Sequence, residues 1–284
     1  LYAYALSELK AKRIKQMYKD AHIHTTVSHD GKSSVMEYIA AAPGKNVDEI
    51  TLTEHYDDYE GIETKLRTLD VAAYAAEYER IRGMTDFPVN FGIEIGLRPE
   101  CAERTKRMAE SYPFDFIIGS SHITAGKDMA YDPSFFHERT RKEAYMVYFN
   151  EVLENIKIYD IFDVYGHLDY VVRYGGYPQK KLDYAEFSEI LDEIFRALIR
   201  RDKGIEINTS GIRYGLGTFC PNRELLKRYL ELGGKIITLG SDAHRAEDLA
   251  ADFGNAIELL KSLGVKEIAV FRKRQPEWIS LREF

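Results

Sequence analysis

The chain has 284 residues, of which 45% are hydrophobic and 30% are charged, and these values are typical of a globular protein with a sizeable core. One α/β barrel of about 250 residues fits this length as well as two smaller domains do. The formal net charge is −7, with 39 Lys and Arg against 46 Asp and Glu, which argues against a general nucleic-acid-binding surface. An anionic substrate would therefore need a local positive site.

Neither a membrane span nor a secretion signal is indicated. The apolar runs are far shorter than the ~20 residues that cross a bilayer, and the N-terminus lacks a charged-then-apolar signal pattern. Only two cysteines, Cys101 and Cys220, are present, and their wide separation predicts neither a disulfide framework nor a zinc ribbon. We therefore expect a cytoplasmic protein without a membrane partner, and the sequence leaves its oligomeric state open.

Residues 1–16 are typical of a basic, helix-compatible extension, and Met17 could be the original start. From there, segments with strand character alternate with segments of helical periodicity. The expected strands are 17–24, 49–55, 89–95, 114–122, 161–167, 204–208 and 235–241, with a final candidate at 267–271. The clearest expected helices are 64–83, 100–111, 137–159, 184–203, 223–232 and 247–263.

This alternation predicts one α/β domain over residues 17–284. Strands separated by helices imply parallel strands joined by right-handed crossovers. The seven units favour a TIM-like barrel over an open sheet, and no low-complexity segment or linker interrupts them.

Polar residues fall at the C-terminal ends of the expected strands. The first strand places His22 and His24 on one face, because side chains alternate along a strand. Imidazole is the commonest protein ligand for transition metals, although this pair alone could simply be two polar residues that close a strand. The later strand ends supply Glu54, His55, Glu94, Ser121, His122, His167, Glu206, Asn208, Asp242 and His244. Six of the eight histidines thus lie where barrel enzymes place their chemistry, which predicts a shared metal site.

The ordered motifs DAHIHT, TEH, GIEIG, GSSH, GHLD and GSDAH resemble those of the polymerase and histidinol phosphatase (PHP) superfamily of metal-dependent phosphoesterases, over about residues 18–272. Within that superfamily, GHLDYVVRYG at 166–175 and IEINTSGIR at 205–213 are most similar to the histidinol-phosphatases. The resemblance implies a distorted seven-unit (β/α)7 barrel of the PHP type that carries a trinuclear metal site.

The resemblance also implies the ligands of two to three divalent transition metals, which could be Zn, Fe or Mn. One metal would be bound by His22, His24, Glu94 and Asp242. Glu94 would bridge to a second metal held by His122 and His167, and a third would be held by Asp30, His55 and His244. Many relatives have a histidine in place of Asp30, and the neighbouring His29 is expected to face solvent.

Three divalent cations against the carboxylates Asp30, Glu94 and Asp242 would leave a positive pocket, because histidines bind metals as neutral ligands. Such a pocket attracts a phosphate dianion. Paired metals also lower the pKa of a shared water, so that a metal-bridging hydroxide could attack phosphorus in line with the leaving alkoxide. Glu94, Asp242 and His244 are the expected catalytic residues. Arg173 and Arg213 are the candidates for gripping phosphate oxygens, with surface salt bridges as the alternative.

The expected function is therefore the hydrolysis of a small phosphorylated substrate, L-histidinol phosphate, to L-histidinol and phosphate in histidine biosynthesis. A PHP phosphatase that acts on another small phosphate ester or on a nucleotide is one alternative. A second is an inactive PHP domain that keeps its metals for structure, which the intact ligand residues at all nine positions argue against. An amidohydrolase also uses His-x-His on a barrel, but its characteristic lysine has no counterpart here.

Overall fold

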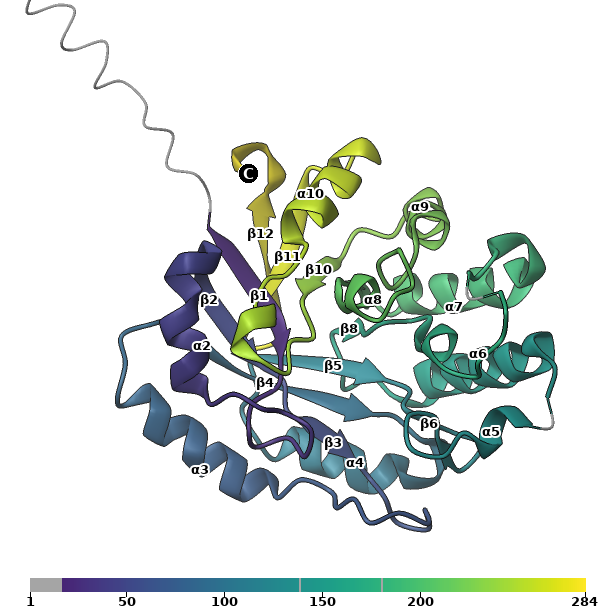
Figure 1. Cartoon of the computed structure of the whole chain (residues 1–284), viewed down its shortest axis with the longest axis horizontal. Helices are drawn as coiled ribbons and strands as arrows, with labels where there is room; N and C mark the ends of the chain where they lie inside the picture. The colour runs from purple at the N-terminus through teal and green to yellow at the C-terminus, as the bar shows by residue number, and fades with distance from the viewer. Residues whose placement is uncertain (1–16, 138, 180) are drawn as a thin grey trace, which may run out of the picture.

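Seven parallel strands form a nearly closed barrel in the computed structural model, which describes residues 17–284 except 138 and 180 (Figure 1). The expectation for residues 1–16 lies outside the described residues. In spatial order the strands are β1 (Tyr18–Ile23), β2 (Val47–Leu52), β4 (Val89–Gly96), β5 (Phe116–Ser120), β8 (Val164–Tyr165), β9 (Gly204–Asn208) and β10 (Ile237–Gly240). The predicted barrel of seven parallel units is confirmed. The second expected strand, 49–55, is divided in two. β2 ends at Leu52, and the short strand β3 (His55–Asp57) pairs with the end of β4 instead.

The first and last barrel strands join at their C-terminal ends. The Asp242 N–H donates to the His22 carbonyl and the His24 N–H donates to the Ala243 carbonyl, both at 2.8 Å. A parallel bridge between Ile23 and Ala243 completes the closure. Because β1 and β10 meet at this edge, His22, His24 and Asp242 are fixed relative to one another by backbone hydrogen bonds.

Helices surround the strands on the outside of the barrel (Figure 1). The α-helices are α2 (Val35–Ala41), α3 (Val71–Arg82), α4 (Ala102–Glu110), α5 (Ser134–His137), α6 (Arg141–Ile158), α7 (Ser188–Arg200), α8 (Ser210–Arg213), α9 (Arg223–Glu231) and α10 (Phe253–Ser262). Short 3-10 turns are η1 (Ala42–Lys45), η2 (Pro99–Cys101), η3 (Tyr170–Arg173), η4 (Tyr184–Glu186), η5 (Ala246–Asp248) and η6 (Leu281–Glu283).

Two helices begin later than the periodicity predicts, because a capping side chain fixes the first turn. The Asp70 carboxylate accepts a hydrogen bond from the Ala73 N–H, so α3 begins at Val71 rather than at 64. Thr140 and Glu143 form a reciprocal capping box, so α6 begins at Arg141 rather than at 137.

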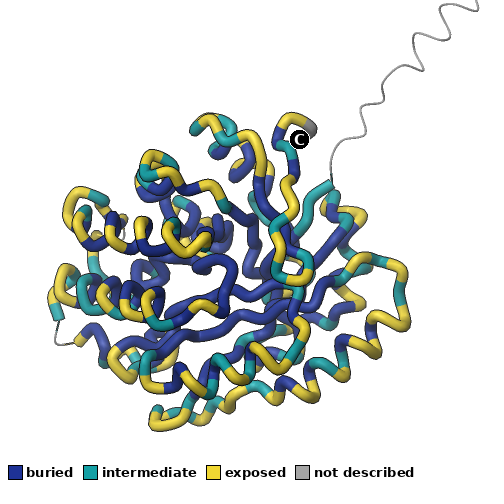
Figure 2. The backbone as a smooth tube through the Cα atoms, turned by 180° about the vertical axis from the view of Figure 1, so that it is seen from behind, coloured by how far each residue is buried: buried dark blue, intermediate teal, exposed yellow. Residues whose placement is uncertain are grey.

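The strands are buried on both faces, and exposure is concentrated on the outer sides of the helices (Figure 2). Every residue of β5 and β9 is buried. One large apolar cluster fills the space between sheet and helices, and a smaller one lies inside the barrel, made of Ala21, Phe116, Ile118, Val164, Ala269 and Phe271. Parallel barrel strands need this double burial, because helices cover one face and the barrel interior covers the other.

The final strand candidate does form, but it does not join the barrel. The strand β11 (Glu267–Arg272) pairs antiparallel with β12 (Gln275–Ser280) in a separate hairpin. Phe271 stacks on Phe116 with ring centroids 5.1 Å apart, and Arg274 Nε lies 2.6 Å from Asp163 Oδ2 just before β8. The hairpin therefore closes the N-terminal end of the barrel and leaves the C-terminal end open for chemistry.

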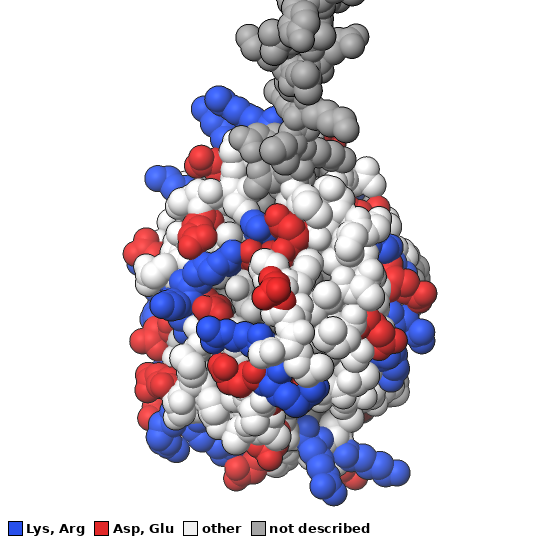
Figure 3. All heavy atoms as spheres, turned by 90° about the vertical axis from the view of Figure 1, so that its left-hand side faces the viewer, with Lys and Arg blue, Asp and Glu red and all other residues white. Residues whose placement is uncertain are grey.

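Among the described residues, no helix combines the length and apolar character that crossing a membrane requires. On the face seen in Figure 3, acidic and basic side chains are interspersed. Such mixed charge is typical of a solvated face.

Candidate metal centre

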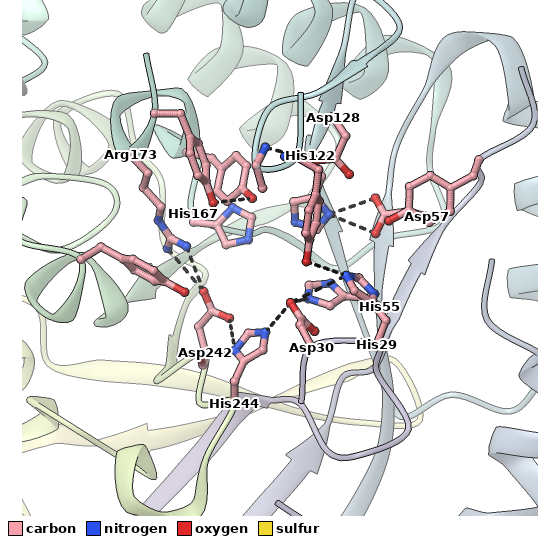
Figure 4. Close-up of a pocket in the computed structure, with 16 residues that line it drawn as sticks. His29, Asp30, His55, Asp57, His122, Asp128, His167, Arg173, Asp242 and His244 are labelled. Atoms are coloured by element: carbon pink, nitrogen blue, oxygen red, sulfur yellow. Dashed lines mark hydrogen bonds and ion pairs between the residues drawn. The ribbon is translucent and has the colours of Figure 1, made fainter. Parts of the chain in front are cut away.

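A cavity of about 260 Å³ opens at the C-terminal end of the barrel strands (Figure 4). Six of the expected ligands line it, namely Asp30, His55, His122, His167, Asp242 and His244. The other three, His22, His24 and Glu94, have no exposed surface and lie directly behind this lining. The structure therefore brings all nine expected ligands into one cluster.

Glu94 lies at the centre of the cluster, where the register of β3 and β4 sets it opposite His55. Its Oε1 is 2.8 Å from His167 Nε2 and 3.3 Å from His122 Nε2. Its Oε2 is 2.8 Å from His55 Nδ1 and 3.5 Å from the Nε2 atoms of both His22 and His24. Because its two oxygens face different imidazoles, this carboxylate has the arrangement that a bridge between two cations needs.

The first strand brings two imidazole nitrogens unusually close together. His22 Nε2 and His24 Nε2 are 2.9 Å apart, and Asp242 Oδ1 lies 3.7 and 3.5 Å from them. At most one proton can lie between two such nitrogens, so a lone pair is available in this position. A shared cation would satisfy the nitrogens and the carboxylate together.

A third group of ligands lies nearer the mouth of the cavity. Asp30 Oδ2 is 3.2 Å from His244 Nε2 and 3.6 Å from His55 Nε2. His29 is exposed, as expected, and its ring also borders the cavity, where Nε2 is 3.1 Å from the Tyr131 hydroxyl and 3.9 Å from Asp30 Oδ2. Of Asp30 and His29, Asp30 therefore lies nearer to His55 and His244, the other ligands expected for the third metal.

Two carboxylates outside the expected set of ligands orient the histidines from behind. His22 Nδ1 lies 2.6 Å from Glu206 Oε1, and His122 Nδ1 lies 3.0 Å from Asp57 Oδ1. Carboxylates in this position fix the tautomer of a metal-ligating histidine and direct its other nitrogen towards the metal. Asp57 follows His55 at the spacing of one strand face, which is a signal that could have found it.

Glycines of the motifs make room for these carboxylates. A Cβ atom on Gly240 would lie 2.1 Å from Glu206 Oε1, and one on Gly96 would lie 1.9 Å from Asp57 Oδ1. Only glycine tolerates these approaches. Each of the motifs GSDAH and GIEIG therefore contains an expected metal ligand. Each also contains a glycine that leaves room for the carboxylate that orients another expected ligand.

Glu54 of the TEH motif has a structural role away from the cavity. It is fully buried, and it accepts hydrogen bonds from the hydroxyl and the backbone N–H of both Thr25 and Ser28. It thereby fixes the loop between His24 and Asp30.

The charges of the cluster are compatible with metal binding. Burial alone would raise the pKa of Glu94, but His122, His22 and His55 together lower it well below its usual range. Burial lowers the pKa of His24 well below its usual value, and the pKa of His167 is lowered mainly by burial too. At neutral pH the site therefore offers an ionised central carboxylate and, at His24 and His167, neutral imidazoles, as metal ligation requires.

We expect metal binding to release protons from this site. Burial would lower the pKa of His22, but Glu206, Glu94 and Asp242 raise it well above its usual value, and Asp57 and Glu94 do the same for His122 despite its burial. These imidazoles hold a proton at pH 7 in the metal-free protein, so a metal must displace it, and affinity should weaken as pH falls. Titration calorimetry in buffers of different ionisation enthalpy measures the release. A binding enthalpy that is the same in every buffer would contradict this expectation.

The two arginines occupy different positions. Arg173 lines the cavity between the rings of Tyr170 and Tyr214, and its Nη1 is 3.3 Å from Asp242 Oδ2. Arg213 is not among the residues that line the cavity, because its Nη2 turns away to donate to the carbonyls of Ser241 and Asp242, both at 2.9 Å. Asp242 has a left-handed backbone with φ of 53°, which these two bonds hold in place. In this geometry Arg213 contacts the backbone of an expected ligand, and its expected contact with phosphate stays a prediction.

The chemistry of the donor set fits divalent transition metals. The ligand atoms form four groups of three within 4.8 Å: His24, His55 and His244; His22, His167 and Asp242; His22, His24 and Glu94; and His55, Glu94 and His122. Within the described part of the chain, the buried oxygens Glu94 Oε2 and Asp30 Oδ1 accept no hydrogen bond. Mixed imidazole and carboxylate ligands at the open end of a parallel barrel define a metal-dependent barrel enzyme.

Comparison with known proteins identifies the family. The PHP domain matches residues 20–210, and the chain belongs to the PHP domain family, as its motifs predicted. A protein of Clostridium acetobutylicum named probable histidinol-phosphatase is 33% identical over 259 residues, which are 91% of this chain and 98% of that protein.

Two solved structures resemble this one. The crystal structure of histidinol phosphate phosphatase from Lactococcus lactis subsp. lactis, complexed with zinc, L-histidinol and phosphate, has a TM-score of 0.83 and 31% identity and covers 91% of this chain and 98% of that one. A putative histidinol phosphatase from Listeria monocytogenes, at 18% identity and a TM-score of 0.71, covers 84% of this chain and 99% of its own and shares the fold.

Proposed function

We propose that this protein is a metal-dependent phosphomonoesterase that hydrolyses L-histidinol phosphate to L-histidinol and phosphate, a step of histidine biosynthesis that we place in the cytoplasm. The observation that carries the proposal is the buried Glu94-centred cluster of imidazoles and carboxylates at the open end of the barrel. It is supported by relatives that bear the name histidinol-phosphatase over about nine-tenths of this chain.

The proposal gives each part of the cluster a task. The ligands would be His22, His24, Glu94 and Asp242 for one metal, Glu94, His122 and His167 for a second, and Asp30, His55 and His244 for a third. When bound, these ions would polarise the phosphoryl oxygens and lower the pKa of an attacking water. Glu206 and Asp57 keep two of the histidines in the productive tautomer.

Arg173 adds a fixed positive charge beside the cluster. Its side chain is 4% exposed, and its Nε, also buried, has no hydrogen-bond partner among the described residues. A guanidinium held between two tyrosine rings is oriented before a substrate arrives, and its remaining donors suit phosphate oxygens. We therefore assign to Arg173 the contact with the phosphoryl group.

The cavity favours a small ester over a nucleotide. Its volume of about 260 Å³ lies just below the range for small-molecule sites, roughly 300–1,000 Å³. Tyrosine side chains, among them Tyr59, Tyr131 and Tyr174, line the part of the wall that the expected ligands leave open. A different small phosphate ester remains the alternative substrate.

Phosphate release from a panel of esters tests the proposed function. The metal-loaded protein should hydrolyse L-histidinol phosphate with a higher kcat/KM than glycerol phosphates, sugar phosphates or nucleoside monophosphates, and a chelator should stop the reaction. Equal or higher kcat/KM for one of the other esters would replace the substrate. Activity that persists after complete metal removal would overturn the metal-dependent class.

A further inference from the structure

One buried carboxylate of the cavity has no task in the metal centre. Asp128 is 5% exposed and lines the cavity, but among the described residues it belongs to none of the groups that could hold a metal ion. It lies at the end of β7 (Lys127–Asp128), which pairs with β6 (Ile123–Thr124) in a hairpin that directly follows His122. The hairpin places this carboxylate beside the metal centre without adding it to the ligands.

The orientation of Asp128 is fixed by its own backbone turn. Its Oδ1 accepts hydrogen bonds from the N–H groups of Ala130 at 3.0 Å and Tyr131 at 3.3 Å. Both bonds go to Oδ1, so Oδ2 accepts no hydrogen bond within the described part of the chain and is left to face the cavity. A carboxylate oxygen that is fixed in the cavity wall and has no protein partner is available to a ligand in the cavity.

The surroundings of Asp128 favour a cation. Burial raises the pKa of Asp128, the neighbouring Asp57 adds to the rise, and His122 opposes it. A positively charged ligand would therefore stabilise the ionised carboxylate. The rings of Tyr59 and Tyr131 line the same part of the cavity, and aromatic faces attract organic cations. Figure 4 shows Asp128 across the cavity from Arg173 and Asp242, with the histidines between them.

We propose that Asp128 binds the positively charged amino group of the substrate and thereby selects phosphate esters of amino alcohols. This inference rests on the proposed function and names the specificity-determining residue of the same site. The cavity is then matched to a zwitterionic substrate, because the guanidinium of Arg173 lies at one side and the free carboxylate oxygen of Asp128 at the other. Asp128 also borders a second cavity of about 290 Å³.

The test compares two esters in the Asp128→Asn variant of the metal-loaded full chain. One is L-histidinol phosphate, and the other is its analogue without the amino group, 3-(imidazol-4-yl)propyl phosphate, both at pH 8 so that the imidazole is neutral. We expect kcat/KM for L-histidinol phosphate to fall about 10- to 50-fold, mainly through KM, because a charge-assisted hydrogen bond is lost. The value for the analogue should change less than about twofold, and metal content should stay the same.

Asp132→Asn is the matched control. Asp132 is a nearby acidic residue that lines the second cavity but not the first, and its carboxylate is paired with Lys127 at 2.8 Å. This variant should keep the wild-type ratio between the two esters. Equal losses on both esters in Asp128→Asn, a loss of metal, or an unchanged ratio would each overturn the inference.

A second pair of esters separates this inference from the proposed function. 4-Aminobutyl phosphate and pentyl phosphate differ mainly in the ammonium group. If the wild type fails on L-histidinol phosphate, the proposed substrate is wrong, yet a preference for the aminobutyl ester that disappears in Asp128→Asn still supports the cation subsite. A wild type that prefers pentyl phosphate, or treats the two esters alike, would overturn the subsite whatever the natural substrate is.

Discussion

Replacing Glu94 by glutamine is expected to remove at least one bound metal and to slow turnover 1000-fold or more, roughly 4 kcal/mol in activation free energy. Glu94 is fully buried, and its two oxygens approach five imidazoles. Glutamine keeps the size of the side chain but loses the charge, and one coordinating oxygen becomes an amide nitrogen that cannot coordinate. Elemental analysis and kcat measured on the same preparation check both parts of the prediction.

His244→Ala is the matched comparison for this experiment. His244 lies at the mouth of the cavity beside Asp30, and its ion-pair contacts are with Asp30 and Asp242 rather than with Glu94. Its defect should be confined to the third metal and should be partly reversed by added metal, whereas that of Glu94→Gln should not. Full metal content together with near-normal turnover in Glu94→Gln would show that this carboxylate is no bridge.

The barrel could be predicted because its signals are local and repeat along the chain. Each buried run that ends in a ligand-type residue is visible in the sequence, and parallel strands necessarily bring these ends to one side. What sequence reasoning placed less well depends on tertiary pairing. β11 carries the pattern of a barrel strand, but its partner is the later strand β12, and only the folded chain shows that Phe271 enters the barrel interior.

Within the site, the clustering of the expected ligands was predictable, and the residues that support them were not. Histidine and acidic residues at strand ends indicate a metal site by their residue type alone. Glu206, in contrast, contacts His22 only because β9 pairs with β10 and because Gly240 has no side chain. Asp128 lies in a hairpin outside the barrel sheet, where no strand-end rule applies. The two arginines look equivalent in their motifs, and their difference arises from the direction in which each guanidinium turns.

This difference between the arginines leads to the second prediction with a large effect. Arg173→Ala should lower kcat/KM about 30- to 150-fold, on the order of 2–3 kcal/mol, because a charged donor that is held in the cavity wall would be lost from the phosphoryl group. The metals should remain, because Asp242 Oδ2 keeps its hydrogen bonds from Asn208 Nδ2 at 3.2 Å and Ser210 Oγ at 3.1 Å. Steady-state kinetics and elemental analysis on the same variant separate these two effects.

Arg213→Ala is expected to behave differently, because Arg213 donates to the backbone of Asp242, an expected metal ligand, and does not line the cavity. Losing its hydrogen bonds to the Ser241 and Asp242 carbonyls should relax the left-handed conformation of Asp242, so metal affinity should fall while KM for the metal-saturated enzyme stays near that of the wild type. Saturating metal should restore most of the activity to Arg213→Ala and none to Arg173→Ala. If instead both variants lose phosphate affinity with full metal content, Arg213 reaches the substrate and the positions assigned to the two guanidinium groups do not hold during catalysis.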